Sequence, residues 1–293
     1  VLEMNQKKIK TRAKINLTLD VLRKREDGYH EVEMIMQTID LFDEMEFTVK
    51  EKGIAIYCDH CQVPKDETNI VYRAAKLLQE EYQVEKGIEI IIHKRIPVAA
   101  GLAGGSTNAA GTLAALNELW DLNLKVSKLM ELGKQIGADV PFCLLGGTVL
   151  AQGIGERLEV LPALPPAWMV LVKPTISVST AWVYQNLKLN ENTQHPYTSK
   201  VIEAIKEQDI DKMIPYFDNI LEGVTTIAYP EIKSIKKRLE DLGATGVLMS
   251  GSGPTVFGFC KDQEKAQSIY HILKGEYQEV FVVRTYNEEE KGV

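Results

Sequence analysis

One glycine-rich stretch constrains this chain more than any other, because it joins a strand-like run to a helix-like run. Before it, residues 87–93 are rich in isoleucine, which favours a buried strand. After it, apolar residues recur every three or four positions, which predicts a helix over about 106–120, capped by Ser106 or Thr107. The connection, residues 97–107, therefore exposes its main chain at the start of a helix.

The connecting stretch has the composition of a loop that binds phosphate. Its residues are Pro97, Val98, Ala99, Ala100, Gly101, Leu102, Ala103, Gly104, Gly105, Ser106 and Thr107. Glycines 101, 104 and 105 tolerate positive φ and let a ligand approach the main chain, and the free N–H groups of a helix N-terminus attract anions. The pattern matches neither the P-loop nor the dinucleotide fingerprint. A glycine turn that only allows close helix packing is the alternative.

Composition bounds the class of protein. The chain has 293 residues, of which 45% are hydrophobic and 26% charged, which is typical of a soluble globular protein. Its net charge of −7 argues against nucleic acid or an anionic membrane as a partner, and no apolar run approaches the roughly 18 residues of a membrane span. We therefore expect a cytoplasmic monomer or weak homodimer whose partners are small molecules.

A proline-rich segment marks the expected domain boundary. Residues 161–167 contain three prolines, the clearest change of composition in the chain, and predict domains at 4–163 and 164–286. Residues 1–3 precede Met4 and are interpreted as a cloning remnant, and residues 287–293 as a frayed acidic tail.

Four cysteines raise the question of a metal site. Cys58 and Cys61 have a spacing that zinc sites use, but no second pair of cysteines or histidines follows at a suitable distance. Cys143 and Cys260 stand singly in apolar runs. We therefore expect thiols without disulfides and no metal held by the protein alone.

The first strand carries a polar face. Residues 9–22 alternate between apolar and polar side chains, which places Lys14 and Asn16 on the same side. A half-exposed strand with a solvated lysine is the ordinary explanation. A tight turn at Asp27-Gly28 then leads to Tyr29 and His30, a ring that can stack and a donor or acceptor beside it. A planar base could use both.

A single carboxylate stands out later in this half. Asp139 lies between a helix-ending glycine and Pro141, where a turn is the simplest explanation. Its functional interpretation needs a partner such as Lys14 on the first strand. The apolar residues 142–151, interrupted by two glycines, predict a bent strand.

The second half predicts a split βαβ arrangement with extra helices. Strands are expected at 168–173, 245–249, 254–260 and 279–285, and helices at about 180–187, 198–207, 213–222, 230–242 and 262–274. A second glycine-rich loop, Gly251-Ser252-Gly253-Pro254, links the two middle strands. It is either a plain hairpin turn or a loop that closes over phosphate.

Three features together resemble the GHMP small-molecule kinases. They are residues 13–17 with Asp27-Gly28-Tyr29-His30, the loop 97–107 followed by residues 108–110, and the segment 251–255. The resemblance covers about residues 10–285. Within the family, the chain is most similar to the branch that uses cytidine diphosphate methylerythritol in isoprenoid biosynthesis. The resemblance implies an α+β fold with an N-terminal domain like ribosomal protein S5 domain 2, a C-terminal ferredoxin-like domain, and an active site in the cleft between them.

The resemblance also implies an activity and a set of site residues. Such kinases transfer the γ-phosphoryl group of ATP to an alcohol, here the 2-hydroxyl, with Mg²⁺. Asp139 matches the catalytic carboxylate and Lys14 its paired lysine. The matching positions for the substrate are Asn16, Tyr29, His30 and Tyr184, and those that line the ATP pocket beside the loop are Asn69, Lys94 and Asn108. Thr107 replaces a frequent serine, and Ala99 and Ala100 replace glycines of some relatives, without removing a needed donor.

Two alternatives stay open. One is a kinase of the same family that acts on homoserine, mevalonate or a sugar, and the other is a nucleotide-binding protein without activity. Tyr29 and His30 favour the cytidine substrate, because the other alcohols offer no base to stack. Lys14 and Asp139 favour an enzyme, because a binding module has no use for a positioned base.

Overall fold

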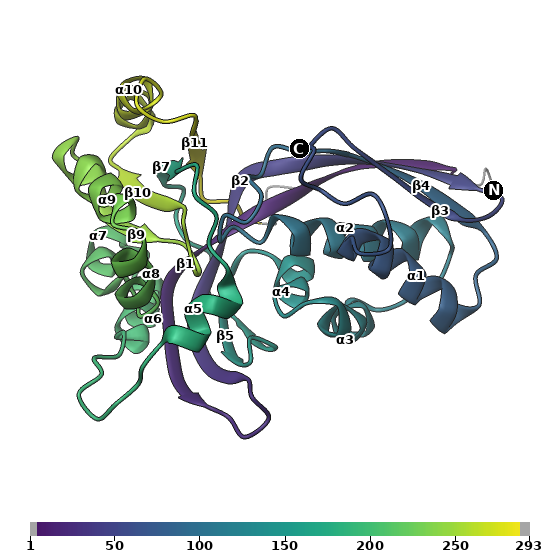
Figure 1. Cartoon of the computed structure of the whole chain (residues 1–293), viewed down its shortest axis with the longest axis horizontal. Helices are drawn as coiled ribbons and strands as arrows, with labels where there is room; N and C mark the ends of the chain where they lie inside the picture. The colour runs from purple at the N-terminus through teal and green to yellow at the C-terminus, as the bar shows by residue number, and fades with distance from the viewer. Residues whose placement is uncertain (1–4, 288–293) are drawn as a thin grey trace. The chain divides into compact units, whose positions relative to one another are not determined.

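The computed structural model describes residues 5–287 (Figure 1). The remnant expected at 1–3 lies outside the described residues, as does the expected tail except residue 287. Contacts group the chain into two compact units, each built from several segments of the sequence. Within the described residues, the first unit contains 5–13, 41–98 and 103–145, and the second contains 14–40, 99–102 and 146–287. The units therefore interleave in sequence, and the boundary expected near residue 163 stays a prediction.

The first unit combines a small sheet with four helices. Its strands include the beginning of β1 (Gln6–Lys24) and the end of β2 (His30–Lys50), where β2 pairs antiparallel with β4 (Gly87–His93). β4 also pairs in parallel with β3 (Ile54–Cys58). The helices are α1 (Ile70–Tyr82), α2 (Gly104–Leu119), α3 (Val126–Ile136) and α4 (Val140–Leu145). Alternate apolar residues of the strands face the helices and form one core, in which Phe47, Ile90 and Leu113 are buried.

The second unit contains the other ends of β1 and β2. Here β1 pairs in parallel with β8 (Asp218–Asn219), and β2 pairs antiparallel with β5 (Thr148–Gly153), which in turn pairs with β6 (Arg157–Val160). Short helices follow one another in this unit. They are α5 (Thr180–Asn186), α6 (Thr198–Lys206), α7 (Ile210–Met213) with a 3₁₀ turn (Ile214–Tyr216), and α8 (Glu222–Ala228).

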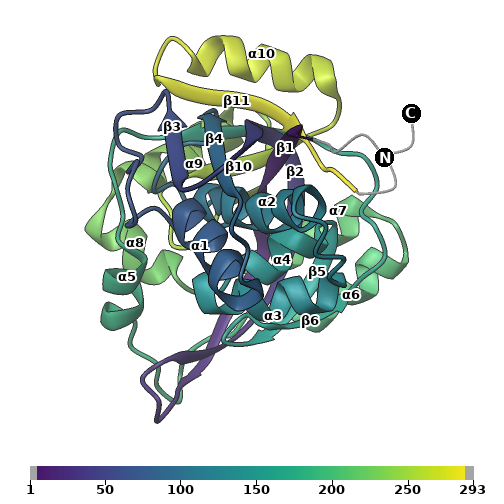
Figure 2. The same ribbon diagram turned by 90° about the vertical axis from the view of Figure 1, so that its right-hand side faces the viewer.

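A four-stranded antiparallel sheet in the second unit confirms the expected split βαβ arrangement. Its strands are β7 (Trp168–Lys173), β9 (Thr245–Met249), β10 (Val256–Cys260) and β11 (Glu279–Arg284), in the spatial order β11-β7-β10-β9. Helix α9 (Glu231–Asp241) packs on β9 and β10, and α10 (Gln263–Leu273) packs on β7 and β11, along which it lies in Figure 2. The expected α+β class is confirmed.

Two expected elements are wrong. Residues 142–151 do not form one bent strand, because α4 occupies 140–145 and β5 begins only at 148. A short apolar run fits a buried helix turn as well as a strand, and proline is well tolerated where α4 begins. The helix expected at 213–222 is interrupted because Asn219 lies in β8 and donates from its amide to the carbonyls of Met249 and Gly251.

Candidate active site

The N-terminus of α2 carries the free main-chain groups that the sequence suggested. In the first unit α2 begins at Gly104, and its N-cap residue is Ala103, at φ 57°, whose side chain makes no capping hydrogen bond. The prediction that Ser106 or Thr107 caps the helix is wrong, since both lie inside it. With no capping side chain, the N–H groups of the first turn remain suited to an anion.

Gly104 and Gly105, in the first turn of α2, leave little room for a Cβ and do not adopt positive φ. Positive φ occurs at Ala99, Gly101 and Ala103, so of the three glycines that tolerate it only Gly101 adopts it. A Cβ added to Gly104 would lie 2.9 Å from Lys94 Nζ, and one added to Gly105 would lie 3.2 Å from Ile70 Cδ1. Alanine in the left-handed region is strained, a feature that gathers at functional sites.

The turn that holds Asp139 lies beside this helix start. Within the first unit, a Cβ added to Gly137 would lie 3.8 Å from the Ser106 hydroxyl, in the first turn of α2. The Asp139 carbonyl accepts the Cys143 N–H at 3.0 Å, so Asp139 immediately precedes α4 and is half-buried. The structure thus brings the segment of the expected catalytic carboxylate to the expected phosphate site.

Lys14 and Asn16 are buried together in the second unit. The Lys14 side chain is 5% exposed, and its Nζ donates to Asn16 Oδ1 at 2.7 Å and to the Gly101 carbonyl at 3.3 Å. Asn16 is fully buried, with its amide 3.3 Å from the Met34 sulfur. The ordinary explanation, a solvated lysine on an exposed strand face, is therefore wrong. Burying an ammonium group costs desolvation free energy, so buried lysines are found with hydrogen-bonding partners.

The second glycine-rich loop supports residues 99–102 of the first. In the second unit the Ser250 hydroxyl donates to the Gly101 carbonyl at 2.9 Å, and the Thr255 N–H donates to the Ala100 carbonyl at 3.4 Å. The loop also links β9 to β10 as the expected hairpin. A Cβ added to Gly101 would lie 2.1 Å from the Ser250 carbonyl oxygen, so the two loops are in main-chain contact.

Replacing Gly101 with alanine is expected to lower the stability of the protein. At φ 76° the new Cβ meets the Ser250 carbonyl, so strain and clash together should cost about 2–4 kcal/mol of unfolding free energy. Gly147→Ala is the matched control, because Gly147 has φ 78° and open space around it. Urea unfolding of both variants separates the clash from the strain, and an equal loss in the two would contradict the close contact.

His30 and Tyr184 lie close together, and their binding of a base stays a prediction. In the second unit their ring centroids are 5.2 Å apart at an interplanar angle of 42°. Burial, and to a lesser extent the charge of Lys24, lowers the pKa of His30 from its usual 6.5. Tyr29 is 61% exposed and its N–H donates to Asp27 at 3.1 Å, which fixes the turn before it. An exposed ring and a neutral imidazole suit stacking and hydrogen bonding to a planar base.

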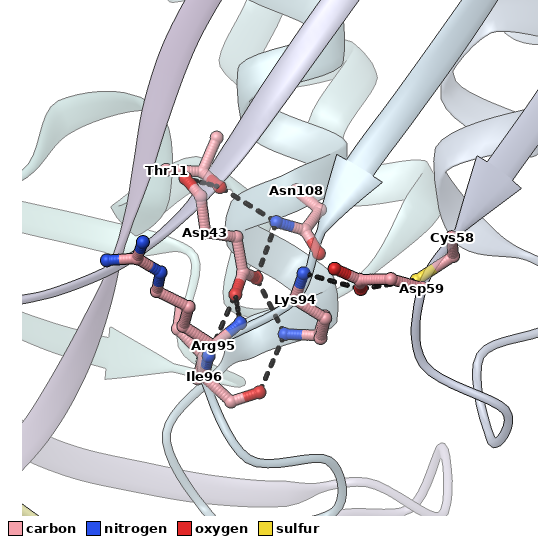
Figure 3. A network of polar contacts seen from close by, with 8 residues as sticks. All are labelled: Thr11, Asp43, Cys58, Asp59, Lys94, Arg95, Ile96 and Asn108. Carbon is pink, nitrogen blue, oxygen red and sulfur yellow. Dashed lines mark hydrogen bonds and ion pairs between the residues drawn. The ribbon is translucent and has the colours of Figure 1, made fainter.

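The side chains of the remaining expected ATP residues make hydrogen bonds within the protein. Lys94 Nζ donates to Asp43 at 2.6 Å, and the Asn108 amide donates to Asp43 at 2.9 Å (Figure 3). Asn69 caps α1, because its Oδ1 accepts the Val71 N–H at 2.8 Å. Direct contact of these residues with ATP stays a prediction.

Two buried carboxylates were not predicted from the sequence. Asp43 lies on β2 among other charged residues, where no pattern distinguishes it. Asp20 shares the polar face of β1 with Lys14 and bonds His195 Nδ1 at 2.8 Å. Burial raises the pKa of Asp20, and His195 opposes this shift. Asp20 could have been predicted as a buried residue only if the polar face of β1 had been known to be buried.

Residues 5–287 contain neither a cluster of metal-ligating side chains nor a membrane-spanning helix. Within residues 5–287, no three histidine, cysteine, aspartate or glutamate side chains are grouped so that they could hold a metal ion. Cys58 is buried and Cys61 is exposed. Among the helices of these residues, none is both long and apolar enough to span a membrane.

Comparison with known families decides the class of this site. A family described as GHMP kinases N terminal domain matches residues 69–147, and one described as GHMP kinases C terminal matches residues 201–279. The chain is a GHMP kinase. The first match includes the glycine-rich loop, α2 and Asp139, so the expected phosphate site and the segment of the expected catalytic carboxylate belong to the matched region.

Relatives of this GHMP kinase are similar over nearly its whole length. Proteins named 4-diphosphocytidyl-2-C-methyl-D-erythritol kinase from Bacillus velezensis and Exiguobacterium sibiricum are 52% and 50% identical over 96% of the chain, which covers 97% and 98% of those proteins. The crystal structure of a 4-(cytidine 5'-diphospho)-2C-methyl-D-erythritol kinase superposes with a TM-score of 0.81 at 33% identity. That match covers 96% of this chain and all of the other.

Proposed function

We propose that this GHMP kinase transfers the γ-phosphoryl group of ATP to the 2-hydroxyl of 4-diphosphocytidyl-2-C-methyl-D-erythritol. The observation that carries the proposal is identity of 50–52% over 96% of the chain with proteins of that name. The paired rings of His30 and Tyr184 support a substrate that contains a base. Homoserine, mevalonate and simple sugars would leave these rings unused.

Each group of residues in the site has its own role in phosphoryl transfer. The main chain of residues 101–107 and the α2 dipole hold the triphosphate. The substrate hydroxyl oxygen attacks the γ-phosphorus as the bond to the departing ADP oxygen breaks, and Asp139 accepts the hydroxyl proton. Lys14 keeps Asp139 ionised and offsets charge on the moving phosphoryl group. Asn16, whose oxygen already binds Lys14, orients the acceptor alcohol beside it.

Mg²⁺ fits this scheme as a companion of ATP. The described residues offer no cluster of three ligating side chains, whereas Mg²⁺ is commonly held by substrate phosphates with one or two carboxylates. When bound it would neutralise phosphate charge. The protein residues above still position the reactants and move the proton.

Activity with a panel of alcohols tests the proposal. ADP release from ATP should depend on the cytidine substrate and be at least about 100-fold slower in kcat/KM with homoserine, mevalonate or galactose. Tyr184→Ala should raise KM for the cytidine substrate about tenfold, because stacking on one ring contributes about 1–3 kcal/mol. Preference for mevalonate would overturn the substrate, and nucleotide binding without turnover would favour a binding protein.

The substrate KM is expected to depend on pH through His30. Its lowered pKa keeps the imidazole neutral at pH 7, so KM should stay level from pH 8 to 6.5 and rise only below that range, where the ring gains a proton. Below the shifted pKa, KM should rise by at most about tenfold per pH unit, as for one proton. In His30→Asn this rise should disappear. A rise that persists in this variant would assign the titration to another group.

A further inference from the structure

A fully buried carboxylate in the first unit binds residues on both sides of the glycine-rich loop. Asp43, on β2, is 0% exposed, and each of its oxygens accepts two hydrogen bonds (Figure 3). Oδ1 accepts the N–H groups of Arg95 and Ile96 at 2.7 and 2.8 Å. Oδ2 accepts from Lys94 Nζ at 2.6 Å and from Asn108 Nδ2 at 2.9 Å. The acceptor positions of this carboxylate are therefore filled.

These bonds join three parts of the chain that meet at the loop. Arg95 and Ile96 lead from β4 into the loop, whose first residue is Pro97, and Asn108 lies in α2 just after the loop ends. Asp43 itself belongs to β2. One carboxylate thus fixes both the entry to the loop and the helix that follows it.

The network also fixes the cation beneath the loop. The Lys94 side chain is 4% exposed, and its Nζ donates to the Ile96 carbonyl at 2.9 Å besides binding Asp43. Gly104, the first residue of α2, has no room for a Cβ beside this ammonium group. Asn108 completes the cluster by donating to Thr11 Oγ1 at 2.8 Å.

We propose that Asp43 is a positioning residue for the ATP-binding loop. Through Arg95, Ile96 and Asn108 it sets the geometry of the phosphate cradle, the main chain of residues 101–107. It also pairs with Lys94, so that neither charge is buried without a partner. This inference rests on the proposed ATP-dependent kinase activity. Changing a residue with this role should lower kcat/KM for ATP and leave KM for the alcohol substrate unaffected.

Asp43→Asn tests the role with a minimal change of shape. The variant can still accept the two main-chain N–H groups through its oxygen, but its amide then faces two donors, Lys94 Nζ and Asn108 Nδ2. We expect kcat/KM for ATP to fall at least tenfold, with KM for the alcohol substrate within twofold of the wild-type value. Both constants are measured by ADP release on folded protein.

Glu46→Gln and an exchange variant are the controls. Glu46 lies three positions further along β2 and pairs with Lys8 at 2.9 Å. Its replacement should leave kcat/KM for ATP and KM for the alcohol within twofold of the wild-type values. Asp43→Asn with Asn108→Asp keeps one carboxylate and one amide in the network with their places exchanged. Its amide at position 43 meets an acceptor at position 108 but still faces Lys94 Nζ, so we expect partial recovery, with kcat/KM for ATP at least about threefold above that of Asp43→Asn.

The outcomes separate this inference from the proposed function. An inactive wild-type protein would overturn the kinase assignment, whereas an active wild type with unchanged ATP kinetics in Asp43→Asn overturns the positioning role. Equal losses for ATP and alcohol also overturn it, since they would mark a general loss of structure. If Asp43→Asn does not fold, the exchange variant decides by the same comparison, and unchanged ATP kinetics or equal losses for ATP and alcohol in that variant overturn the role.

Discussion

Asp139→Asn is expected to lower kcat by about 100-fold or more, with KM for ATP close to the wild-type value. Asparagine keeps the shape of the side chain but cannot accept the hydroxyl proton as the new P–O bond forms. The phosphate cradle at the start of α2 is unchanged, so ATP should still bind. Steady-state ADP release at saturating concentrations of both substrates measures the effect.

Asp121→Asn is the matched control for this prediction. Asp121 is an exposed turn residue of the same unit at φ 52°, a region that asparagine enters readily, so kcat and stability should both stay near their wild-type values. Normal turnover in Asp139→Asn would remove this carboxylate from the mechanism. A large loss in both variants would point instead to disruption of the unit.

The parts of the site that could be predicted from sequence depend on local patterns. The loop and α2 follow from an isoleucine-rich run, glycines and a helical period that are contiguous in the chain. The alternation in β1 correctly places Lys14 and Asn16 on one face. The four strands of the split βαβ arrangement are likewise separate apolar runs with clear turns between them.

What escaped prediction depends on contacts between segments far apart in sequence. Local patterns do not show that the polar face of β1 is buried, because the residues that cover it come from elsewhere in the chain. The sequence left open whether the glycines at 104 and 105 serve backbone freedom or close packing, and only the structure shows that Lys94 and Ile70 lie close to them. Asp43 gave no signal, since its partners lie at least 32 positions away along the chain.

Lys14→Met is expected to lower kcat/KM by about 100- to 1,000-fold, because it removes the buried cation that should stabilise the charge of the transferring group. Methionine has a similar length, so the packing around Asn16 and Gly101 should largely remain. Lys173→Met is the control, since Lys173 is also buried in the second unit, where it pairs with Glu279 at 3.2 Å in the four-stranded sheet. It should lose stability and keep its kinase constants.

Combining Lys14→Met with Asp139→Asn tests whether the two residues act as a pair. Lys14 belongs to the second unit and Asp139 to the first, so their pairing stays a prediction that kinetics can decide. If Lys14 works by keeping Asp139 ionised and sharing its charge, removing the second partner should add little, and the double variant should be about as slow as the slower single variant. Independent residues would instead multiply their effects, to a loss of about 10⁴-fold or more. Multiplied losses would leave both residues important but would contradict the paired mechanism.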